Sequence, residues 1–305
     1  MEQNATLTKD KKGAINVSTF SQKIHSYLKH PFSLLVWIIT ILAALLTAAS
    51  FVYLVLYILI KGVPYLRPEL FSWTYDSNNV SMLPSIINTF LLTALSLVIS
   101  VPLGIFAAIY MVEYAKKGNR IVKFIRVTAE TLSGIPSIVY GLFGMIFFVG
   151  VLKMQLSLLS GSLTVAIMVL PTIMRTTEEA LLSVPQSYRE GSLGLGAGKL
   201  RTVFRIVLPS AVPGILSGVI LATGRIVGET AALIYTAGTM AKVPNNLFAS
   251  ARTLSVHMYL LSNEGLHTNE AFAELAVVLL VFVMLINMLA NFVARRLSAK
   301  NAEND

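Results

Sequence analysis

The chain has 305 residues, of which 55% are hydrophobic and 13% are charged, and it contains no cysteine. Because ordinary soluble domains carry about 25% charged residues, this composition indicates a polytopic membrane protein. The lack of cysteine excludes a disulfide framework and thiolate metal sites. The net charge of +9 would suit a nucleic-acid-binding protein, but no aromatic residues are interleaved with the basic ones in the way such proteins require. We therefore expect no nucleic-acid partner.

Apolar runs in chain order predict six transmembrane helices and an all-α polytopic membrane protein. A helix that crosses ~30 Å of hydrocarbon needs about 20 mostly apolar residues, and a helix satisfies its own backbone hydrogen bonds. The runs are Leu34–Ile60, Ile86–Val112, Ile135–Leu152, Leu156–Met174, Ala211–Tyr235 and Phe272–Ala294. Only a few residues around Lys153 separate the third run from the fourth, so we expect a tight helical hairpin there.

The distribution of basic residues predicts the orientation. Eighteen of the 24 Lys and Arg residues fall in the two tails and in the segments 112–126 and 175–205, whereas five fall in the alternate loops. The positive-inside rule then places both termini in the cytoplasm. The expected organisation is a cytoplasmic tail (1–33), a first transmembrane helix (34–60), a five-helix core (86–294) with a cytoplasmic loop (176–209), and a second cytoplasmic tail (295–305).

Glycine and proline interrupt several of the predicted spans. Small residues let helices approach closely, and broken helices also line translocation paths. The run Gly134-Ile135-Pro136-Ser137 is expected to start or restart a helix. Its exposed N–H groups would attract anions, but a kink that serves packing is the favoured interpretation.

The cytoplasmic loop 176–209 carries features that lipid does not explain. Pro185 and Gly198 divide it into two short helical pieces. The first is expected from Tyr188 to about Leu195, with Ser187 as its cap and Glu190 in its first turn. A short helix followed by a glycine-mediated turn makes a compact knob for a groove on a partner protein.

The second piece of the loop, Lys199–Leu208, carries Val203, Ile206 and Val207 on one side. The glycine-rich stretch before it does not have the spacing of a phosphate-binding P-loop, because Leu193 and Leu200 stand where that motif needs Gly and Ser or Thr. We therefore expect no ATP binding by this loop.

Two charged residues lie within the fifth predicted span. An Arg such as Arg225 costs ~2.5–3.5 kcal/mol at a helix centre on insertion scales, so it is expected to face a partner or a wet cavity. Glu229 follows one helical turn later and can pair with it. Glu113 and Glu130 look like solvated charges at the membrane interface, and His257 and His267 have no metal-ligand spacing.

The cytoplasmic loop closely resembles the signature of the membrane subunits of ATP-binding-cassette (ABC) importers. That signature is Glu-Ala-Ala, three residues, Gly, nine residues and Ile-x-Leu-Pro. Its positions are occupied here by Glu190, Gly191, Ser192, Gly196, Ile206, Leu208 and Pro209, with Gly191 and Ser192 in place of the two Ala residues. The resemblance implies a type I importer permease fold, with a loop that docks on a separate, dimeric ATP-binding subunit.

Other runs resemble one branch of that family, the phosphate-uptake permeases. They are GIPSIVYGLFG (134–144), Leu-Pro-Thr (170–172) with Arg175, and Val-Pro (184–185) with Tyr-Arg-Glu (188–190). The run GRIVGETAAL (224–233) resembles the A-type subunit (PstA-like) more than its C-type sibling (PstC-like). Together these features cover roughly residues 86–296.

The resemblance implies one half of a phosphate import pathway in the bacterial cytoplasmic membrane. The expected partners are a second homologous permease, the ATPase and an external phosphate-binding protein that contacts the segment 237–270. Arg225 would bind phosphate, Glu229 would neutralise the empty site, Thr230 would add a hydroxyl donor, and Arg175 is a candidate second basic station. No catalytic residue, metal or cofactor is expected in this chain, because ATP hydrolysis would occur on the partner.

Several alternatives remain open at this point. The transported anion could instead be another oxyanion such as sulfate or molybdate, and the chain could be the C-type sibling. An ion channel or a membrane sensor is a different class, but neither needs a loop for docking an ATPase.

Overall fold

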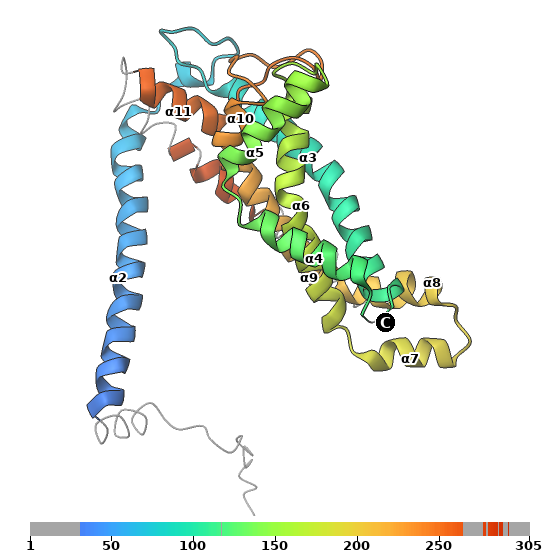
Figure 1. Ribbon diagram of the computed structural model, residues 1–305. Coiled ribbons are helices and arrows are strands. Elements are labelled where there is room, and N and C mark those ends of the chain that lie inside the picture. The colour runs from blue at the N-terminus through green and yellow to red at the C-terminus, as the bar shows by residue number, and fades with distance from the viewer. Residues whose placement is uncertain are drawn as a thin grey trace, which may run out of the picture. The chain divides into compact units, whose positions relative to one another are not determined.

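A computed structural model describes residues 31–116, 118–264, 277–278, 280–285, 287–288 and 292. Every regular element within them is a helix (Figure 1), which confirms the all-α prediction. The chain forms two compact units, residues 1–57 and 58–305. The expected N-terminal and C-terminal tails lie almost entirely outside the described residues, as does much of the expected sixth span, Phe272–Ala294.

The described part of the first unit is one long helix, α2 (Pro31–Gly62), whose last turn enters the second unit. Large apolar side chains project from all around it, among them Phe32, Leu46 and Phe51, each at least 70% exposed. A helix that is apolar on every side belongs in a membrane rather than in water. This agrees with the predicted first span.

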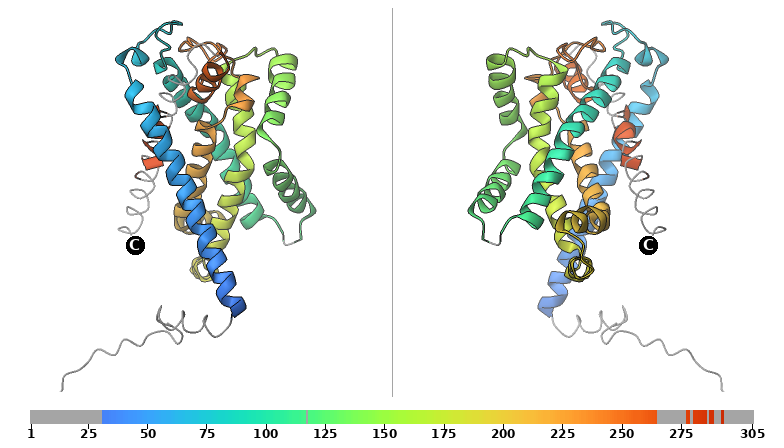
Figure 2. Two further views of the ribbon diagram at one scale, coloured as in Figure 1. Left: turned by 90° about the vertical axis from the view of Figure 1, so that its left-hand side faces the viewer. Right: turned by 90° about the vertical axis from the view of Figure 1, so that its right-hand side faces the viewer.

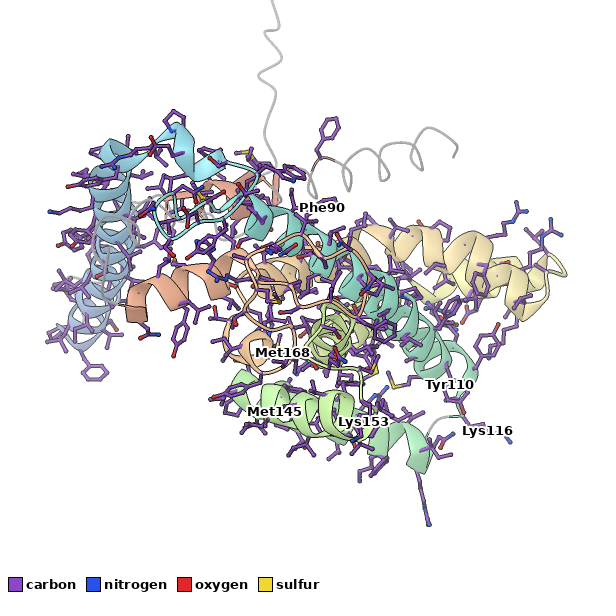
Figure 3. The ribbon with its side chains drawn as sticks, turned by 90° about the horizontal axis from the view of Figure 1, so that it is seen from above. Phe90, Tyr110, Lys116, Met145, Lys153 and Met168 are labelled. Atoms are coloured by element: carbon purple, nitrogen blue, oxygen red, sulfur yellow. The ribbon has the colours of Figure 1, made fainter. Side chains whose placement is uncertain are left out.

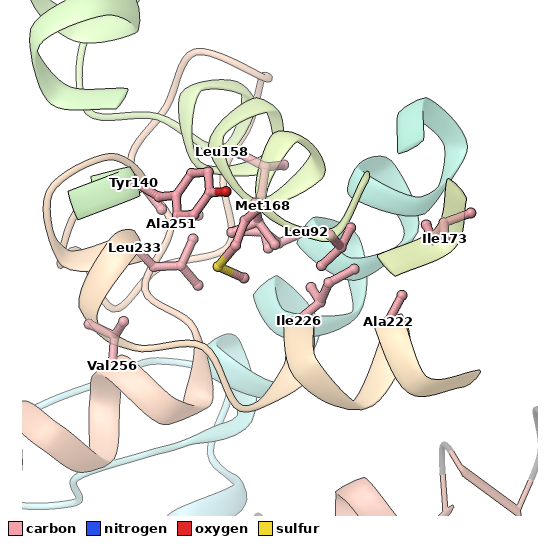
Figure 4. Close-up of a cluster of buried hydrophobic side chains, with 13 residues drawn as sticks. Leu92, Tyr140, Leu158, Met168, Ile173, Ala222, Ile226, Leu233, Ala251 and Val256 are labelled. Atoms are coloured by element: carbon pink, nitrogen blue, oxygen red, sulfur yellow. The ribbon is translucent and has the colours of Figure 1, made fainter. Parts of the chain in front are cut away.

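The centre of the second unit is formed by three helices in mutual contact, α3 (Leu83–Ile109), α6 (Leu158–Ser183) and α9 (Leu208–Val227). Leu92, Met168 and Ile226, one from each helix, meet in a fully buried cluster (Figure 4). Seen from above, Met168 of α6 lies between α3 and the helix that carries Met145 (Figure 3).

Close contacts between these helices depend on glycine. A methyl group at Gly104 of α3 would lie 2.8 Å from Cγ2 of Ile173 in α6, and one at Gly218 of α9 would lie 1.9 Å from Oγ1 of Thr176. Neither position has room for a larger residue. The small residues noted in the sequence therefore bring α3 and α9 against α6.

The segment between α3 and α6 is bent rather than straight. It comprises α4 (Arg120–Ser133), α5 (Ser137–Gly144) and a π-helical continuation, Met145–Val151. The break at Gly134–Pro136 turns the path by 105°, and Figure 2 shows the bent pair along one side of the unit. The run Ile135–Leu152 was thus correctly expected to be helical and to restart at Gly134–Ser137. The prediction missed that α4 shares the same path.

The two ends of the second unit differ in character. The α3–α4 connection and α7 (Gln186–Gly194) lie at one end in Figures 1 and 2, and α10 (Ala231–Ile234) and α11 (Leu254–Glu264) lie at the other. The two basic segments of the core, 112–126 and 175–205, are found at the first end. We call this end the basic end and the opposite one the far end.

Within the described residues, four helices are long and apolar enough to cross a membrane, and α4 with α5 makes a fifth if the bent pair is one span. Two predicted boundaries were wrong. The fourth span runs on to Ser183 instead of ending at Met174, and the fifth ends at Val227 instead of Tyr235. Gly228 ends α9, and a separate short helix, α10, follows.

Candidate functional site

The loop that carries the signature contains the predicted short helix, but with an earlier start. Helix α7 begins at Gln186, directly after Pro185 at its N-cap, and no side chain caps it. Ser187 is therefore not the cap, and Glu190 lies beyond the first turn, so both expectations were wrong. Proline fixes the chain direction here, and its missing N–H costs nothing at this position.

The turn after α7 is built on Gly196, as predicted. Gly196 has a φ of +82°, its N–H donates to the carbonyl of Leu193 (3.0 Å), and the N–H of Ala197 donates to that of Ser192 (3.1 Å). This pair of bonds is a Schellman motif, which needs a left-handed residue and so favours glycine. The turn sends the chain back into α8 (Lys199–Thr202).

The signature residues differ in their burial. Glu190, Gly191 and Gly196 are exposed, whereas Ile206, Leu208 and Pro209 are half-buried along a π-helical segment and the start of α9. Ser192 is buried, and its hydroxyl lies 2.9 Å from that of Thr202. Ser192 thus joins the two arms of the loop, and the exposed residues remain open to contact.

The loop also presents an apolar surface that the sequence analysis missed. Leu195 is 91% exposed at the tip, and Tyr188, Leu193 and Leu200 are each at least half exposed. By contrast, Val203 and Val207 are buried in a second apolar cluster, as their predicted shared side implies. The sequence does contain a signal for this surface, because leucines stand next to the glycines of the turn. A turn this short cannot bury them within the loop.

Glu113 was expected to be a solvated interfacial charge, and this was wrong. It sits in a π-helical segment (Tyr110–Tyr114) that extends α3, its side chain is 8% exposed, and it forms an ion pair with Arg189 of α7 at 2.7 Å. The sequence separates these two residues by 76 positions, so their contact left no local pattern to read.

Arg225 and Glu229 do not pair. Arg225 is half-buried in the last turn of α9, but the helix ends at Val227, which removes the one-turn spacing that a contact requires. The carboxylate of Glu229 instead accepts a hydrogen bond from the N–H of Ala232 at 3.0 Å, at the start of α10. No described acidic residue forms an ion pair with Arg225.

The other predicted pathway residues have mixed surroundings. Thr230 is half-buried at the N-cap of α10, close to Arg225 in the chain. Arg175 lies on α6, 66% exposed, and donates to Glu179 at 3.3 Å. It lines a cavity of about 600 Å³ between α4, α6 and α9.

A buried polar cluster holds the far end together. Nδ1 of the fully buried His257 lies 3.0 Å from the hydroxyl of Ser85 and 3.5 Å from Arg252, and its ring meets Tyr75 edge-on. Burial, followed by the neighbouring guanidinium, lowers the pKa of His257 to about 3, so the ring is neutral. Among the described residues, no group of His, Asp and Glu has the arrangement of a metal site.

Comparison with known proteins identifies the family of the chain. Residues 100–301, about two thirds of the chain, match the family model described as "Binding-protein-dependent transport system inner membrane component". The chain is similar to the probable ABC transporter permease protein YqgI of Bacillus subtilis, with 34% identity over 281 residues, 85% of this chain and 95% of that protein.

Proteins with a more specific description are also similar. They include a PstA homolog of Mycoplasma pneumoniae (30% identity; 86% of this chain, 41% of that protein) and PstA 1 of Mycobacterium tuberculosis (39% over 152 residues; 50% of this chain, 48% of that protein). Among solved structures, a bacterial alginate ABC transporter shares the fold with a TM-score of 0.63 at 16% identity, covering 89% of this chain and 98% of that one. The chain therefore belongs to the family of inner-membrane components of binding-protein-dependent transport systems, the permease subunits of ABC importers.

Proposed function

We propose that this permease subunit serves an ATP-driven importer of inorganic phosphate in the bacterial cytoplasmic membrane, as its A-type component. The similarity to proteins described as PstA supports the substrate. The positive-inside rule places the basic end in the cytoplasm, together with both termini. Import would then run from the far end toward the basic end.

The observation that supports an anionic substrate is the charge of Arg225, which is unpaired among the described residues. Its guanidinium lies in an apolar bundle, half-buried, without an ion pair to a described carboxylate. A cation in such a place needs a compensating partner, and an anion in transit is one. A guanidinium offers a planar fork of donors that matches two oxygens of phosphate, and the neighbouring Thr230 can add a hydroxyl. Since Glu229 is engaged at α10, it does not neutralise Arg225 directly.

The α7 loop is the proposed contact with a separate, dimeric ATPase subunit. Glu190 forms no ion pair with another described residue and is exposed. The exposed apolar side chains beside it, Leu195 above all, would be buried on docking. A central apolar anchor with a polar rim is the usual composition of a stable protein interface. The chain itself would hydrolyse no ATP.

Two further partners complete the proposed importer. A second homologous permease would supply the other half of the pathway, and movement of one permease against the other would alternate access between the two ends. An external phosphate-binding protein would dock at the far end, against the segment that includes residues 237–253. The argument for this external contact is the polar composition of the segment.

Two alternatives share part of this support. A permease for sulfate or molybdate would use the same guanidinium chemistry, so the choice between oxyanions depends on the shape of the assembled pathway. The argument for the C-type sibling is the similarity of the chain to PstC of Mesorhizobium japonicum, with 30% identity over 270 residues, 78% of this chain and 80% of that protein.

Reconstitution tests the proposal. The chain would be purified together with a second permease, an ATPase and a phosphate-binding protein from the same bacterium, and placed in liposomes loaded with ATP. We expect uptake of labelled phosphate that an excess of external sulfate or molybdate does not suppress. Import of sulfate or molybdate in preference to phosphate would overturn the substrate, and transport that needs no ATPase would overturn the importer class.

A further inference from the structure

The cavity at the basic end is lined by charges of both signs. It has a volume of about 600 Å³ and lies between α4, the second half of α6 and Leu221 of α9. Arg126 and Glu130 contribute from α4, and Arg175 and Glu179 from α6. A cavity of this size is in the range of those that hold small ligands.

Each arginine of the cavity is matched with a carboxylate of α6. Nη2 of Arg126 lies 2.5 Å from Oε1 of Glu178, and this ion pair bridges α4 and α6. Within α6, Nε of Arg175 lies 3.3 Å from Oε1 of Glu179. A guanidinium has five N–H donors, and each of these arginines meets its carboxylate through one nitrogen. Both arginines therefore keep donors for a ligand. Arg–Glu pairs of the kind that the sequence suggested for Arg225 and Glu229 are found here instead.

The cavity lies directly inward of Arg225. Leu221, which lines it, is one helical turn from Arg225 on the same face of α9. Gly218 of α9 lies against Thr176 of α6. Arg175, the residue before Thr176, is therefore at about the same height in the helix bundle as Gly218. Arg225 is seven residues beyond Gly218, or ~10 Å farther toward the far end along the helix.

We propose that this cavity is the exit station of the transported anion, where Arg126 and Arg175 bind a tetrahedral oxyanion after it leaves Arg225. The proposal rests on the proposed import of phosphate. Glu178 and Glu179 neutralise the arginines while the station is empty, and together with Glu130 they repel the bound anion. Three carboxylates against two guanidiniums give a weak site, which suits release into the cytoplasm rather than storage.

A weak site open to the cytoplasm has a measurable consequence. Phosphate inside the vesicles should occupy it and slow further uptake. In the reconstituted importer, the concentration of internal phosphate that halves the uptake rate should rise about fivefold or more in Arg126→Ala, because a charged bidentate contact is lost. Arg126→Lys should give a smaller rise. Glu178→Gln should shift the value the other way, because Arg126 loses its competing carboxylate.

The matched control is Arg120→Ala, which removes an exposed arginine from the same helix outside the cavity. It should leave inhibition by internal phosphate unchanged. The half-saturating external phosphate should be the same in all these variants, since loading occurs at the far end.

Equal inhibition in wild type, Arg126→Ala and Glu178→Gln, with uptake intact, would overturn the exit station and leave the proposed function standing.

A phospholipid headgroup presents the same phosphate chemistry. If the effect of Arg126→Ala followed the headgroup of the vesicle lipid while inhibition by internal phosphate stayed constant, the cavity would be a lipid site and the proposal would fail. If wild-type vesicles imported another anion, the proposed substrate would fail, and the same assay with that anion inside would decide the cavity.

Discussion

Arg189 and Glu113 form a hydrogen-bonded ion pair that fastens the α7 loop to the end of α3. Nε and Nη2 of Arg189 donate to Oε1 of Glu113 at 3.0 and 2.7 Å. The same guanidinium donates to the carbonyls of Val184 (2.8 Å) and Leu181 (2.9 Å) at the end of α6, where helical carbonyls lack their usual i+4 donors. A single side chain therefore joins α3, α6 and α7, so that force applied to the loop reaches two of the central helices.

Truncation of this side chain should loosen the loop. Arg189→Ala leaves the carboxylate of Glu113 buried without its partner, a loss of about 3–5 kcal/mol for a buried pair. We expect faster hydrogen exchange in α7, measured by mass spectrometry, and weaker co-purification with the ATPase. Arg201→Ala, which removes an exposed arginine of α8, is the control and should change the exchange little.

A second variant separates the charge from the geometry of this contact. Arg189→Lys keeps the charge but cannot reach all three acceptors at once, so it should restore the slow exchange only in part. Adding Glu113→Gln to Arg189→Ala should recover some stability by removing the buried charge. Identical exchange in wild type and Arg189→Ala would show that the pair does not hold the loop.

The turn at the tip of the loop offers a sharper comparison. Gly196→Ala places a side chain at a φ of +82°, which costs about 1–2 kcal/mol in the left-handed region. Gly194→Ala adds the same methyl group to the last residue of α7, also in open space, and should stabilise the helix slightly. We expect Gly196→Ala to reduce ATPase binding and uptake severalfold, with Gly194→Ala near wild type. Equal activity of the two would mean that the shape of the turn is not needed for docking.

Much of the fold followed from local patterns in the sequence. Apolar length predicts the long helices, and the motif around Gly196 predicts the turn, because both depend on residues adjacent in the chain. The hairpin expected at Lys153 is also found, with Lys153 at a φ of +56°. Boundaries were less predictable. The charged end of α6 was predicted to be a loop because its residues are polar. Composition cannot show that Arg126 of another helix balances the charge of Glu178 there.

The charged residues of the candidate site were harder to predict for the same reason. Arg225 and Glu229 have helical spacing in the sequence, but Gly228 ends the helix between them and Glu229 turns to cap α10. Conversely, Arg189 and Glu113 have no local relationship and meet only in the folded chain. Partners brought together by tertiary packing are what a single sequence leaves undetermined.

Arg225 is expected to be the residue most sensitive to substitution in the pathway. The fifth predicted span has two charged residues, and Glu229 already accepts a hydrogen bond at the start of α10. Arg225→Ala removes the other charge. It should lower phosphate uptake by about a hundredfold, the effect expected when a charge-assisted bidentate contact is lost. Arg225→Lys keeps a point charge without the fork and should retain part of the rate. Uptake by reconstituted vesicles measures both, with membrane insertion checked by blotting. Wild-type rates in Arg225→Ala would remove this residue from the pathway.

The buried His257 should make the stability of the far end depend on pH. Its folded pKa of about 3 lies below the ordinary 6.5, so the unfolded chain binds more protons between these values, and stability falls as the pH drops through that window. Each pH unit of the window corresponds to at most about 1.4 kcal/mol. The melting temperature of the detergent-solubilised protein should therefore fall between pH 6.5 and 5, above the usual range of carboxyl groups. His257→Gln, which cannot take up a proton, should show a smaller fall, whereas parallel curves for the two proteins would mean that His257 does not remain neutral when buried.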